Sequence, residues 1–123
     1  MLDLLGGTKT VNDYFHEKGY KDISILATEA EMHKDWPTQF LNWITPHESN
    51  KILTAFYGEE LLSKQSTGFL WKIMTETGTG KKRIKGQLPE GTVVGHKTGS
   101  SGTNEKGITA AVNNIGIVSL PNG

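Results

Sequence analysis

A lysine, a threonine and a glycine follow one another at the end of a β-branched stretch of this 123-residue chain. The stretch Thr92–Val94 favours an extended strand, which leads into Lys97, Thr98 and Gly99. Such a strand offers an ammonium group, a hydroxyl group and a backbone N–H to one small anion, and the glycine lets a ligand approach the main chain closely. The chemistry that these residues favour is recognition of an anionic substrate beside a sheet edge.

Enzymes that acylate a serine use a Lys-Thr-Gly strand in this way, which points to β-lactam chemistry. The tripeptide also recurs by chance, and a lysine near a strand end is often only a solvated charge that protects a sheet edge. Taken alone, the tripeptide leaves both interpretations open.

The chain as a whole resembles the C-terminal part of the class A β-lactamases over nearly its full length. Four segments occur in that family's order and approximate spacing, namely Leu4–Gly7, Glu29–His33, Val94–Gly99 and Asn113–Ile117. Within the family, the chain looks most like the extended-spectrum branch. That branch has a histidine where most class A enzymes have an asparagine in the omega loop, and His33 matches this histidine. The resemblance implies an α/β (α+β) class A β-lactamase/transpeptidase-like fold, of which this chain holds a piece of the helical subdomain, the omega loop and two antiparallel strands.

Glu29 matches the family's omega-loop glutamate, which acts through a bound water as the general base of deacylation. A carboxylate beside a trapped water can take its proton as the water attacks an ester, which contributes about 10²–10⁴ in rate. Without the resemblance, Glu29 and Glu31 would be read as loop carboxylates that face solvent. His33 would share the water with Glu29 or would simply pack in the loop, and the arginine that the family places earlier in this loop is missing at Ala27-Thr28.

The resemblance also assigns roles to the residues of the Lys-Thr-Gly strand. Lys97 would lie near the nucleophile and the substrate carboxylate, Thr98 would donate a hydrogen bond to that carboxylate, and Gly99 would allow close approach. The backbone N–H of Ser100 would form half of the oxyanion hole, in which one donor is worth on the order of 3 kcal/mol. The Ser100 hydroxyl and Ser101 would line the pocket for the substrate's side chain.

Arg83, the one arginine of the sequence, matches an arginine that reaches the same carboxylate-binding corner in the extended-spectrum branch. A planar guanidinium suits this role because it can bind a carboxylate through two parallel hydrogen bonds. The alternative is an ordinary surface arginine at a helix end. The histidines show no metal-ligand spacing, so we expect neither a metal nor another cofactor.

The family's Ser-x-x-Lys and Ser-Asp-Asn motifs do not occur in this chain. Both lie upstream of the matching region in the family. The sequence also starts abruptly with an apolar Leu2–Leu5 stretch and ends on the turn signal Pro121–Gly123. We therefore expect residues 1–123 to be a partial catalytic domain that lacks the nucleophile region and a C-terminal strand and helix. The rest of the parent chain would then be needed for a complete fold, and residues 1–123 would be inactive alone.

Local signals predict the elements that must position these residues. Thr8 is the expected cap of a helix that ends near His16, and a long ordered loop is expected over 27–43. Thr45, Pro46 and Glu48 predict a helix start with a capping box, and a second helix begins near Ser63 or Ser66. Apolar stripes on these helices are expected to be core. Gly78–Lys82 lacks the spacing of a phosphate-binding loop and is read as a turn.

Composition narrows the class of protein. Thirteen basic and thirteen acidic residues give zero net charge, which does not favour nucleic acid or an anionic membrane as a partner. The absence of cysteine excludes thiol catalysis and disulfides. Export of the parent protein to the periplasm or the outside of the cell is an expectation that comes from the family alone.

The function implied is hydrolysis of the β-lactam ring, a small-molecule substrate, through a serine acyl-enzyme. A penicillin-binding transpeptidase or carboxypeptidase remains an alternative, because it shares the Lys-Thr-Gly strand without needing a deacylating glutamate. A non-catalytic module that binds a β-lactam or a peptide is a second alternative. If the chain is part of a β-lactamase, we expect Glu29 and Lys97, which are far apart in sequence, to serve one ester-hydrolysing site.

Overall fold

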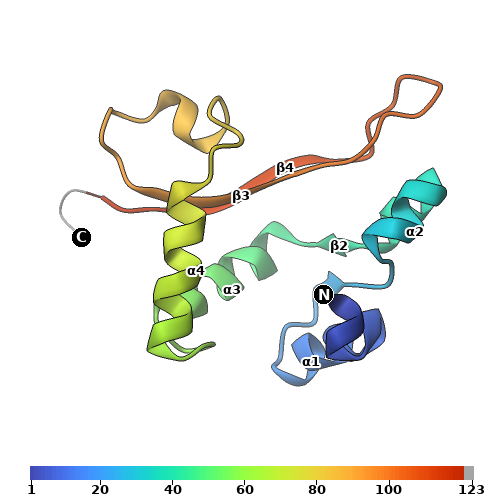
Figure 1. Cartoon of the computed structure of the whole chain (residues 1–123), viewed down its shortest axis with the longest axis horizontal. Coiled ribbons are helices and arrows are strands. Elements are labelled where there is room, and N and C mark those ends of the chain that lie inside the picture. The colour runs from blue at the N-terminus through green and yellow to red at the C-terminus, as the bar shows by residue number, and fades with distance from the viewer. Residues whose placement is uncertain (121–123) are drawn as a thin grey trace. The chain divides into compact units, whose positions relative to one another are not determined.

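The computed structural model describes residues 1–120. The expected turn at Pro121–Gly123 lies outside the described residues. The chain mixes helices with two antiparallel strand pairs (Figure 1). Its elements follow in the order η1 (Leu2–Leu5), α1 (Gly7–Glu17), β1 (Ile23–Ser24), α2 (Glu29–Lys34), η2 (Trp36–Leu41), β2 (Trp43–Ile44), α3 (Pro46–Tyr57), α4 (Lys64–Glu76), η3 (Ile84–Gln87), β3 (Val94–Ser100) and β4 (Val112–Val118), where η marks a 3₁₀-helix.

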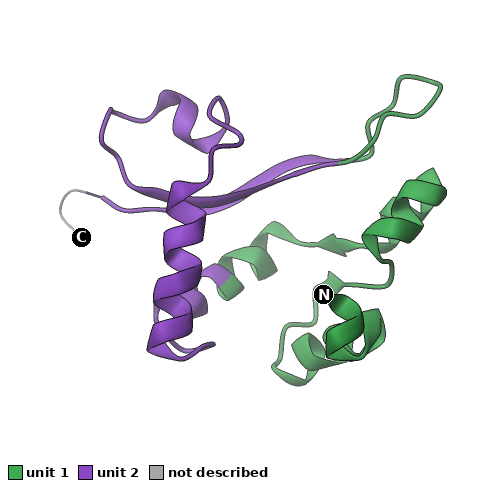
Figure 2. Cartoon of the chain, viewed as in Figure 1, with its two compact units in different colours: residues 1–52, 101–110 green, residues 53–100, 111–123 purple. Residues whose placement is uncertain are grey.

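The chain forms two compact units (Figure 2). Unit 1 comprises residues 1–52 and 101–110, and unit 2 comprises residues 53–100 and 111–123. In unit 1, β1 pairs antiparallel with β2, so that Ile23 lies opposite Ile44 and Ser24 opposite Trp43. This short ladder brings together the two ends of the segment that carries α2 and η2.

Unit 2 is built on the antiparallel pair of β3 and β4. Its register runs from Val94 opposite Val118 to Ser100 opposite Val112, and it places Lys97 opposite Ile115. Helix α4 packs against β3, and Trp71 on that helix fills the space above Gly95, where a Cβ would overlap the indole ring. The predicted strand around Lys97 is therefore confirmed.

The two central helices begin where local signals predicted. Thr45 caps α3, because its hydroxyl accepts the N–H of Glu48 at 3.2 Å, and Ser63 caps α4 by accepting the N–H of Ser66 at 3.2 Å. The predicted capping box at α3 is only half formed. The Glu48 carboxylate does not return to Thr45 but accepts the N–H of Asp22 at 3.1 Å, 26 residues earlier in the chain.

Two other local predictions were wrong. Helix α1 is capped by Gly6 at φ 86°, and not by Thr8, which lies inside the helix. The segment 27–43, expected to be a long ordered loop, instead consists largely of α2 and η2. Helix α2 escaped the periodicity argument because six residues are too short to show an apolar stripe.

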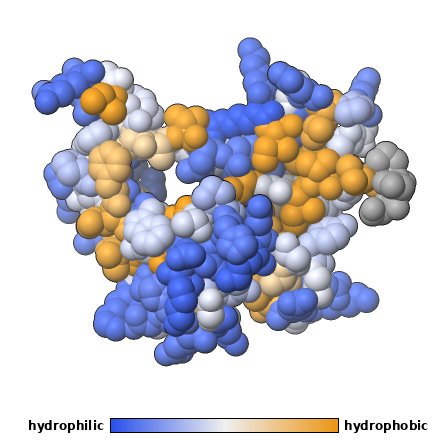
Figure 3. Space-filling model, turned by 180° about the vertical axis from the view of Figure 1, so that it is seen from behind, coloured by the Kyte–Doolittle hydropathy of each residue, from blue (hydrophilic) through white to orange (hydrophobic). Residues whose placement is uncertain are grey.

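The apolar stripes are only partly buried. Met74 on α4 and Phe56 on α3 are buried, whereas Phe69 is 67% exposed and Leu70 and Ile73 are also exposed. Figure 3 shows apolar side chains on the surface among hydrophilic ones. The prediction that the stripes are core therefore holds for Phe56 and Met74 and fails for the exposed residues of α4.

Candidate active site

The two glutamates in the first turn of α2, Glu29 and Glu31, differ in their contacts. Thr28 caps the helix in a complete capping box, since Glu31 accepts both the N–H and the hydroxyl of Thr28 at 2.7 Å. These hydrogen bonds hold the pKa of Glu31 below its ordinary value. Glu31 is thus a structural carboxylate, while its neighbour Glu29 takes no part in the cap.

Glu29 is the first residue of α2 and is largely exposed to solvent, as is His33 one turn later. The side chains are 81% and 76% exposed, and His33 Nε2 lies 3.4 Å from Glu29 Oε1. The spacing of four residues places both on one face of the helix. The pair therefore presents a carboxylate and an imidazole side by side, which can hold a water molecule between acceptor and donor groups.

Asn42 braces the segment that leads into α2. Its Oδ1 accepts the N–H groups of Leu26 and Ala27 at 2.8 and 2.9 Å, and its Nδ2 donates to the Ala27 carbonyl at 2.9 Å. Ala27 is buried, so these backbone groups need partners inside the protein. One amide side chain thus fixes the backbone immediately before the Thr28 cap and Glu29.

Residues 101–110 also pack within unit 1. The indole N–H of Trp36 donates to the Gly102 carbonyl at 3.1 Å, and Thr103 bridges Thr109 across the turn. Ser101, the first residue of this stretch, directs its hydroxyl to the Gly102 carbonyl at 3.2 Å. Residues 101–110 are therefore attached to η2 through Trp36.

Consecutive side chains of a strand point to opposite faces, and on β3 the residues Val94–His96 are buried whereas Lys97 is exposed. His96 is fully buried, and its Nδ1 lies 3.1 Å from Asn114 Oδ1 on β4. Lys97 is exposed, and its ammonium donates to the Thr98 carbonyl. The strand thus presents the Lys97 charge to solvent while His96 anchors the opposite face.

Arg83 lies against the end of β3. Its guanidinium donates to the Gly99 carbonyl at 3.1 Å, to the Asn113 carbonyl at 2.5 Å and to the Ser100 hydroxyl at 2.8 Å. Arg83 therefore ties β3 to β4 as well as presenting a charge. Among residues 1–120, no carboxylate lies within 4.0 Å of the Lys97 or Arg83 side chains, which leaves both cations without an acidic partner.

The turn before Arg83 is shaped to approach β3. Gly80 has φ +65°, and a Cβ at this position would overlap the side chain of Thr98. Thr79 reaches the same residue, with its hydroxyl oxygen 3.0 Å from that of Thr98. The glycine thus lets residues 79–83 close over the threonine that is expected to bind a carboxylate.

The structure groups the residues singled out in the sequence into two sets. Unit 1 holds Glu29, His33 and Ser101. Unit 2 holds the second set, namely Arg83, Lys97, Thr98, Gly99 and Ser100. Within this set, Arg83 contacts Gly99 and Ser100 directly. Within residues 1–120, no group of three or more His, Asp or Glu side chains could hold a metal ion. No helix in the same range is long and apolar enough to cross a bilayer.

Sequence reasoning missed several residues that support these sets. Asn42 and Glu48 act over 15 and 26 residues of sequence, and Thr79 and Asn113 reach β3 or Arg83 from neighbouring segments. For these residues the sequence carries no local signal. The Thr28–Glu31 capping box does carry one, since Thr-x-x-Glu is a recognised helix start.

Comparison with known proteins agrees with this geometry. The model of the Beta-lactamase enzyme family matches residues 1–123. Beta-lactamase VEB-1 from Pseudomonas aeruginosa is 53% identical over 125 residues, which cover 100% of this chain and 42% of that protein. The crystal structure of TLA-1 extended-spectrum β-lactamase is 56% identical with a TM-score of 0.96, over 99% of this chain and 44% of that one.

More distant structures keep the same fold. A representative of class A β-lactamase from Bacteroides cellulosilyticus is 44% identical, with a TM-score of 0.91 over 99% of this chain and 44% of that one. The structure of PBP-A is 28% identical, with a TM-score of 0.80 over 99% of this chain and 41% of that one. This chain spans about two-fifths of the length of the curated relatives that it matches. The sequence and fold match those of class A β-lactamases, extended-spectrum enzymes among them, and the chain therefore belongs to the β-lactamase enzyme family.

Proposed function

We propose that the full-length protein containing these 123 residues hydrolyses the amide bond of the β-lactam ring through a serine acyl-enzyme. The observation that carries this proposal is the end of β3, where Lys97 and Arg83 lack acidic partners, Arg83 binds the Ser100 hydroxyl and Thr98 directly follows Lys97. Two uncompensated cations with hydroxyl donors suit the carboxylate of a β-lactam antibiotic. We also propose that this strand is the family's Lys-Thr-Gly motif and that α2 lies in its omega loop.

In the first half of the reaction, a serine from outside this chain would attack the ring carbonyl. The developing oxyanion would accept a hydrogen bond from the Ser100 N–H, and the C–N bond would break as the ring nitrogen takes the proton that the serine hydroxyl gives up. Lys97 and Thr98 would hold the substrate carboxylate meanwhile, and Arg83 would add a positive charge at the same corner. Ser101 and the Ser100 hydroxyl would contact the substrate's side chain. Gly99 would leave room for the substrate to approach the backbone of β3.

In the second half, Glu29 would act as the general base. Its carboxylate would take a proton from a water molecule as the water oxygen attacks the ester carbonyl, after which the serine oxygen leaves and recovers its proton. His33, 3.4 Å from Glu29, would orient that water. Glu31 is unsuited to the task, because its carboxylate already accepts two hydrogen bonds from Thr28.

We further propose that residues 1–123 are one part of the catalytic domain. The remaining parts would supply the Ser-x-x-Lys and Ser-Asp-Asn motifs and a further strand and helix, and would cover the exposed apolar side chains of α4. The parent protein would be exported to the periplasm or the outside of the cell, where hydrolysis of antibiotics confers resistance.

Replacing Glu29 with Gln in the full-length protein tests the proposal. Glutamine keeps the size of the side chain and removes the base, so deacylation should slow by about 10²–10⁴-fold. Intact-protein mass spectrometry after mixing with a penicillin should then show a stable acyl-enzyme. Turnover at the wild-type rate in this variant would refute the role of Glu29.

The activity of residues 1–123 alone has its own test. We expect no hydrolysis of a chromogenic cephalosporin by the purified 123-residue chain, because it carries no Ser-x-x-Lys nucleophile. Turnover above that of an unrelated protein would contradict this expectation.

A penicillin-binding transpeptidase is the second candidate, favoured by the likeness to PBP-A. In that case Glu29→Gln should leave the lifetime of the acyl-enzyme nearly unchanged. A non-catalytic binding module would instead bind a penicillin reversibly, without any covalent mass shift.

A further inference from the structure

The segment that carries Glu29 is closed by a very short ladder. We call this ladder, formed by Ile23–Ser24 and Trp43–Ile44, the neck of segment 25–42. The N–H of Thr45 adds one bond to the Asp22 carbonyl at 3.0 Å, and the Ser24 hydroxyl donates to the Leu41 carbonyl at 2.8 Å. A two-stranded ladder of this length is marginal in water, so its stability depends on contacts outside it.

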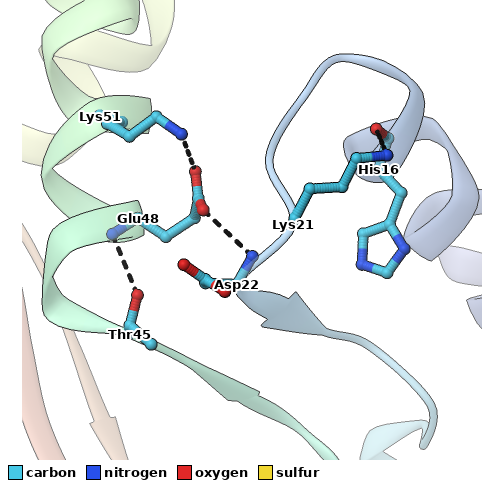
Figure 4. A network of polar contacts seen from close by, with 6 residues as sticks. All are labelled: His16, Lys21, Asp22, Thr45, Glu48 and Lys51. Carbon is cyan, nitrogen blue, oxygen red and sulfur yellow. Dashed lines mark hydrogen bonds and ion pairs between the residues drawn. The ribbon is translucent and has the colours of Figure 1, made fainter.

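Glu48 supplies such a contact at both ends of the neck. The side chain is 2% exposed and projects from the first turn of α3. Its Oε2 accepts the N–H of Asp22, directly before β1, at 3.1 Å, and its own N–H donates to the hydroxyl of Thr45, directly after β2, at 3.2 Å. Figure 4 shows Glu48 between Thr45 on one side and Asp22 on the other. One residue therefore joins the two chain ends that the ladder must hold together.

The buried carboxylate is kept in its charged form by its partners. Lys51 donates to Glu48 Oε1 at 2.6 Å, and its ammonium lies 5.4 Å from the centroid of the Tyr20 ring. The hydrogen bond from Lys51, opposed by burial and supported by the Asp22 N–H, holds the pKa of Glu48 below its ordinary value. A charged acceptor binds the Asp22 N–H more strongly than a neutral one would.

From the neck, hydrogen bonds and directly adjacent residues together lead to Glu29. Asn42 directly precedes β2 and binds the backbone of Leu26 and Ala27, and Thr28 then caps the helix that begins at Glu29. A shift of the neck would move Asn42, and with it the backbone that leads into the cap.

We propose that Glu48 is a positioning residue for deacylation, which fixes Glu29 by holding closed the neck of segment 25–42. This inference rests on the proposed role of Glu29 as general base. Glu48 itself touches no reacting atom and acts through the neck, Asn42 and the Thr28 cap.

The test compares variants of the full-length protein. Glu48→Met keeps the side-chain volume but cannot accept the Asp22 N–H, whereas Glu48→Gln retains an acceptor oxygen. Deacylation, followed by single-turnover kinetics with a penicillin, should slow about 10- to 100-fold in Glu48→Met, because a displacement of about 1 Å can cost about 100-fold. Acylation should change little, and Glu48→Gln should recover most of the loss. Glu48→Ala replaces the methionine variant if that variant does not fold.

Thr45→Ala is the matched control, because it removes the bond to the backbone N–H of Glu48, which Glu48→Met retains, and leaves the Glu48 carboxylate on Asp22. Equal slowing of deacylation in Thr45→Ala and Glu48→Met would mean that the carboxylate has no special part in closing the neck, and would overturn the proposal. Wild-type deacylation in Glu48→Met would overturn it as well.

Amide hydrogen exchange separates this inference from the role of Glu29. In Glu48→Met, the amides of Leu26 and Ala27 should exchange at least about tenfold faster than in Thr45→Ala, since local opening exposes them. If Glu29→Gln gives no stalled acyl-enzyme, the proposed function fails, but faster exchange would still establish the neck contact. If Glu29→Gln stalls and exchange in Glu48→Met is unchanged, only the inference about Glu48 fails.

Discussion

Removing the amide side chain of Asn42 should destabilise the protein more than removing any single loop hydrogen bond. In Asn42→Ala, the N–H groups of Leu26 and Ala27 and the Ala27 carbonyl all lose their partner. A net contribution of about 0.5–1.5 kcal/mol for each of the three bonds gives a total of about 1.5–4.5 kcal/mol. The cost is not relieved by solvent at Ala27, which is only 3% exposed.

Asn12 provides the matched comparison for Asn42. It also binds this segment through its side chain, but with a single bond from the Ile25 N–H at 3.0 Å. Asn12→Ala should cost about 1 kcal/mol or less, since alanine also favours the α1 helix. Asn42→Asp should fall between the two variants, because aspartate keeps the acceptor and loses the donor.

The free energy of unfolding of the full-length variants, measured by urea denaturation, decides between these values. Equal destabilisation by Asn42→Ala and Asn12→Ala would refute the conclusion that Asn42 is the main brace of this segment. A change in the urea dependence of the unfolding free energy would indicate instead that the variant alters the unfolded state.

Three further outcomes are expected. Gly68→Ala on α4 should raise the unfolding free energy by about 0.5–1 kcal/mol, because the added Cβ meets no atom within 4 Å and alanine favours a helix; a lower urea midpoint would contradict this. Because the pKa of Glu48 is lowered in the folded state, its stabilisation should be complete above the unfolded-state pKa near 4.5 and should be lost as pH falls through the folded value. Glu48→Gln should therefore flatten the acid side of the stability–pH curve, and an unchanged curve would exclude this linkage. Arg83→Lys should raise KM for a penicillin about tenfold, since an ammonium cannot reproduce the bonds to Gly99, Ser100 and the Asn113 carbonyl. Steady-state kinetics measures this change, and an unchanged KM would count against substrate binding by Arg83.

The parts of the fold that were predictable are those with local causes. Thr45 and Ser63 each accept a backbone N–H three residues ahead, so a cap can be read from four consecutive residues. The β-branched run before Lys97 similarly predicts a strand, because such side chains fit a pleated surface. Helix α2 was not predicted although its Thr28–Glu31 box is equally local, because a six-residue helix shows no apolar periodicity and the box is its only sequence signal.

The supporting contacts could not be predicted in the same way. Glu48 looks like the second member of a capping box, yet its carboxylate binds Asp22 instead. Asn42 has no distinguishing neighbour in sequence, and its partners lie 15 and 16 residues away. Which of several acceptors a backbone N–H meets depends on the folded path of the chain, and no spacing rule encodes that path.

Arg83 illustrates an intermediate case. Its position relative to Lys97 suggested the correct end of the strand, and a fork of several donors suggested anion binding. Its bonds to the Gly99 and Asn113 carbonyls, which tie β3 to β4, depend on the antiparallel register and were not foreseen. The residue therefore has a stabilising role in addition to the one expected of it.

The continuous register of β3 and β4 restricts how this part of the protein can evolve in length. Side chains of a strand alternate between faces, so one inserted or deleted residue between Val94 and Lys97 would exchange the places of Lys97 and His96. The ammonium would then enter the interior and the imidazole would face water. A change of length should therefore be better tolerated in the connection 101–111 than within either strand.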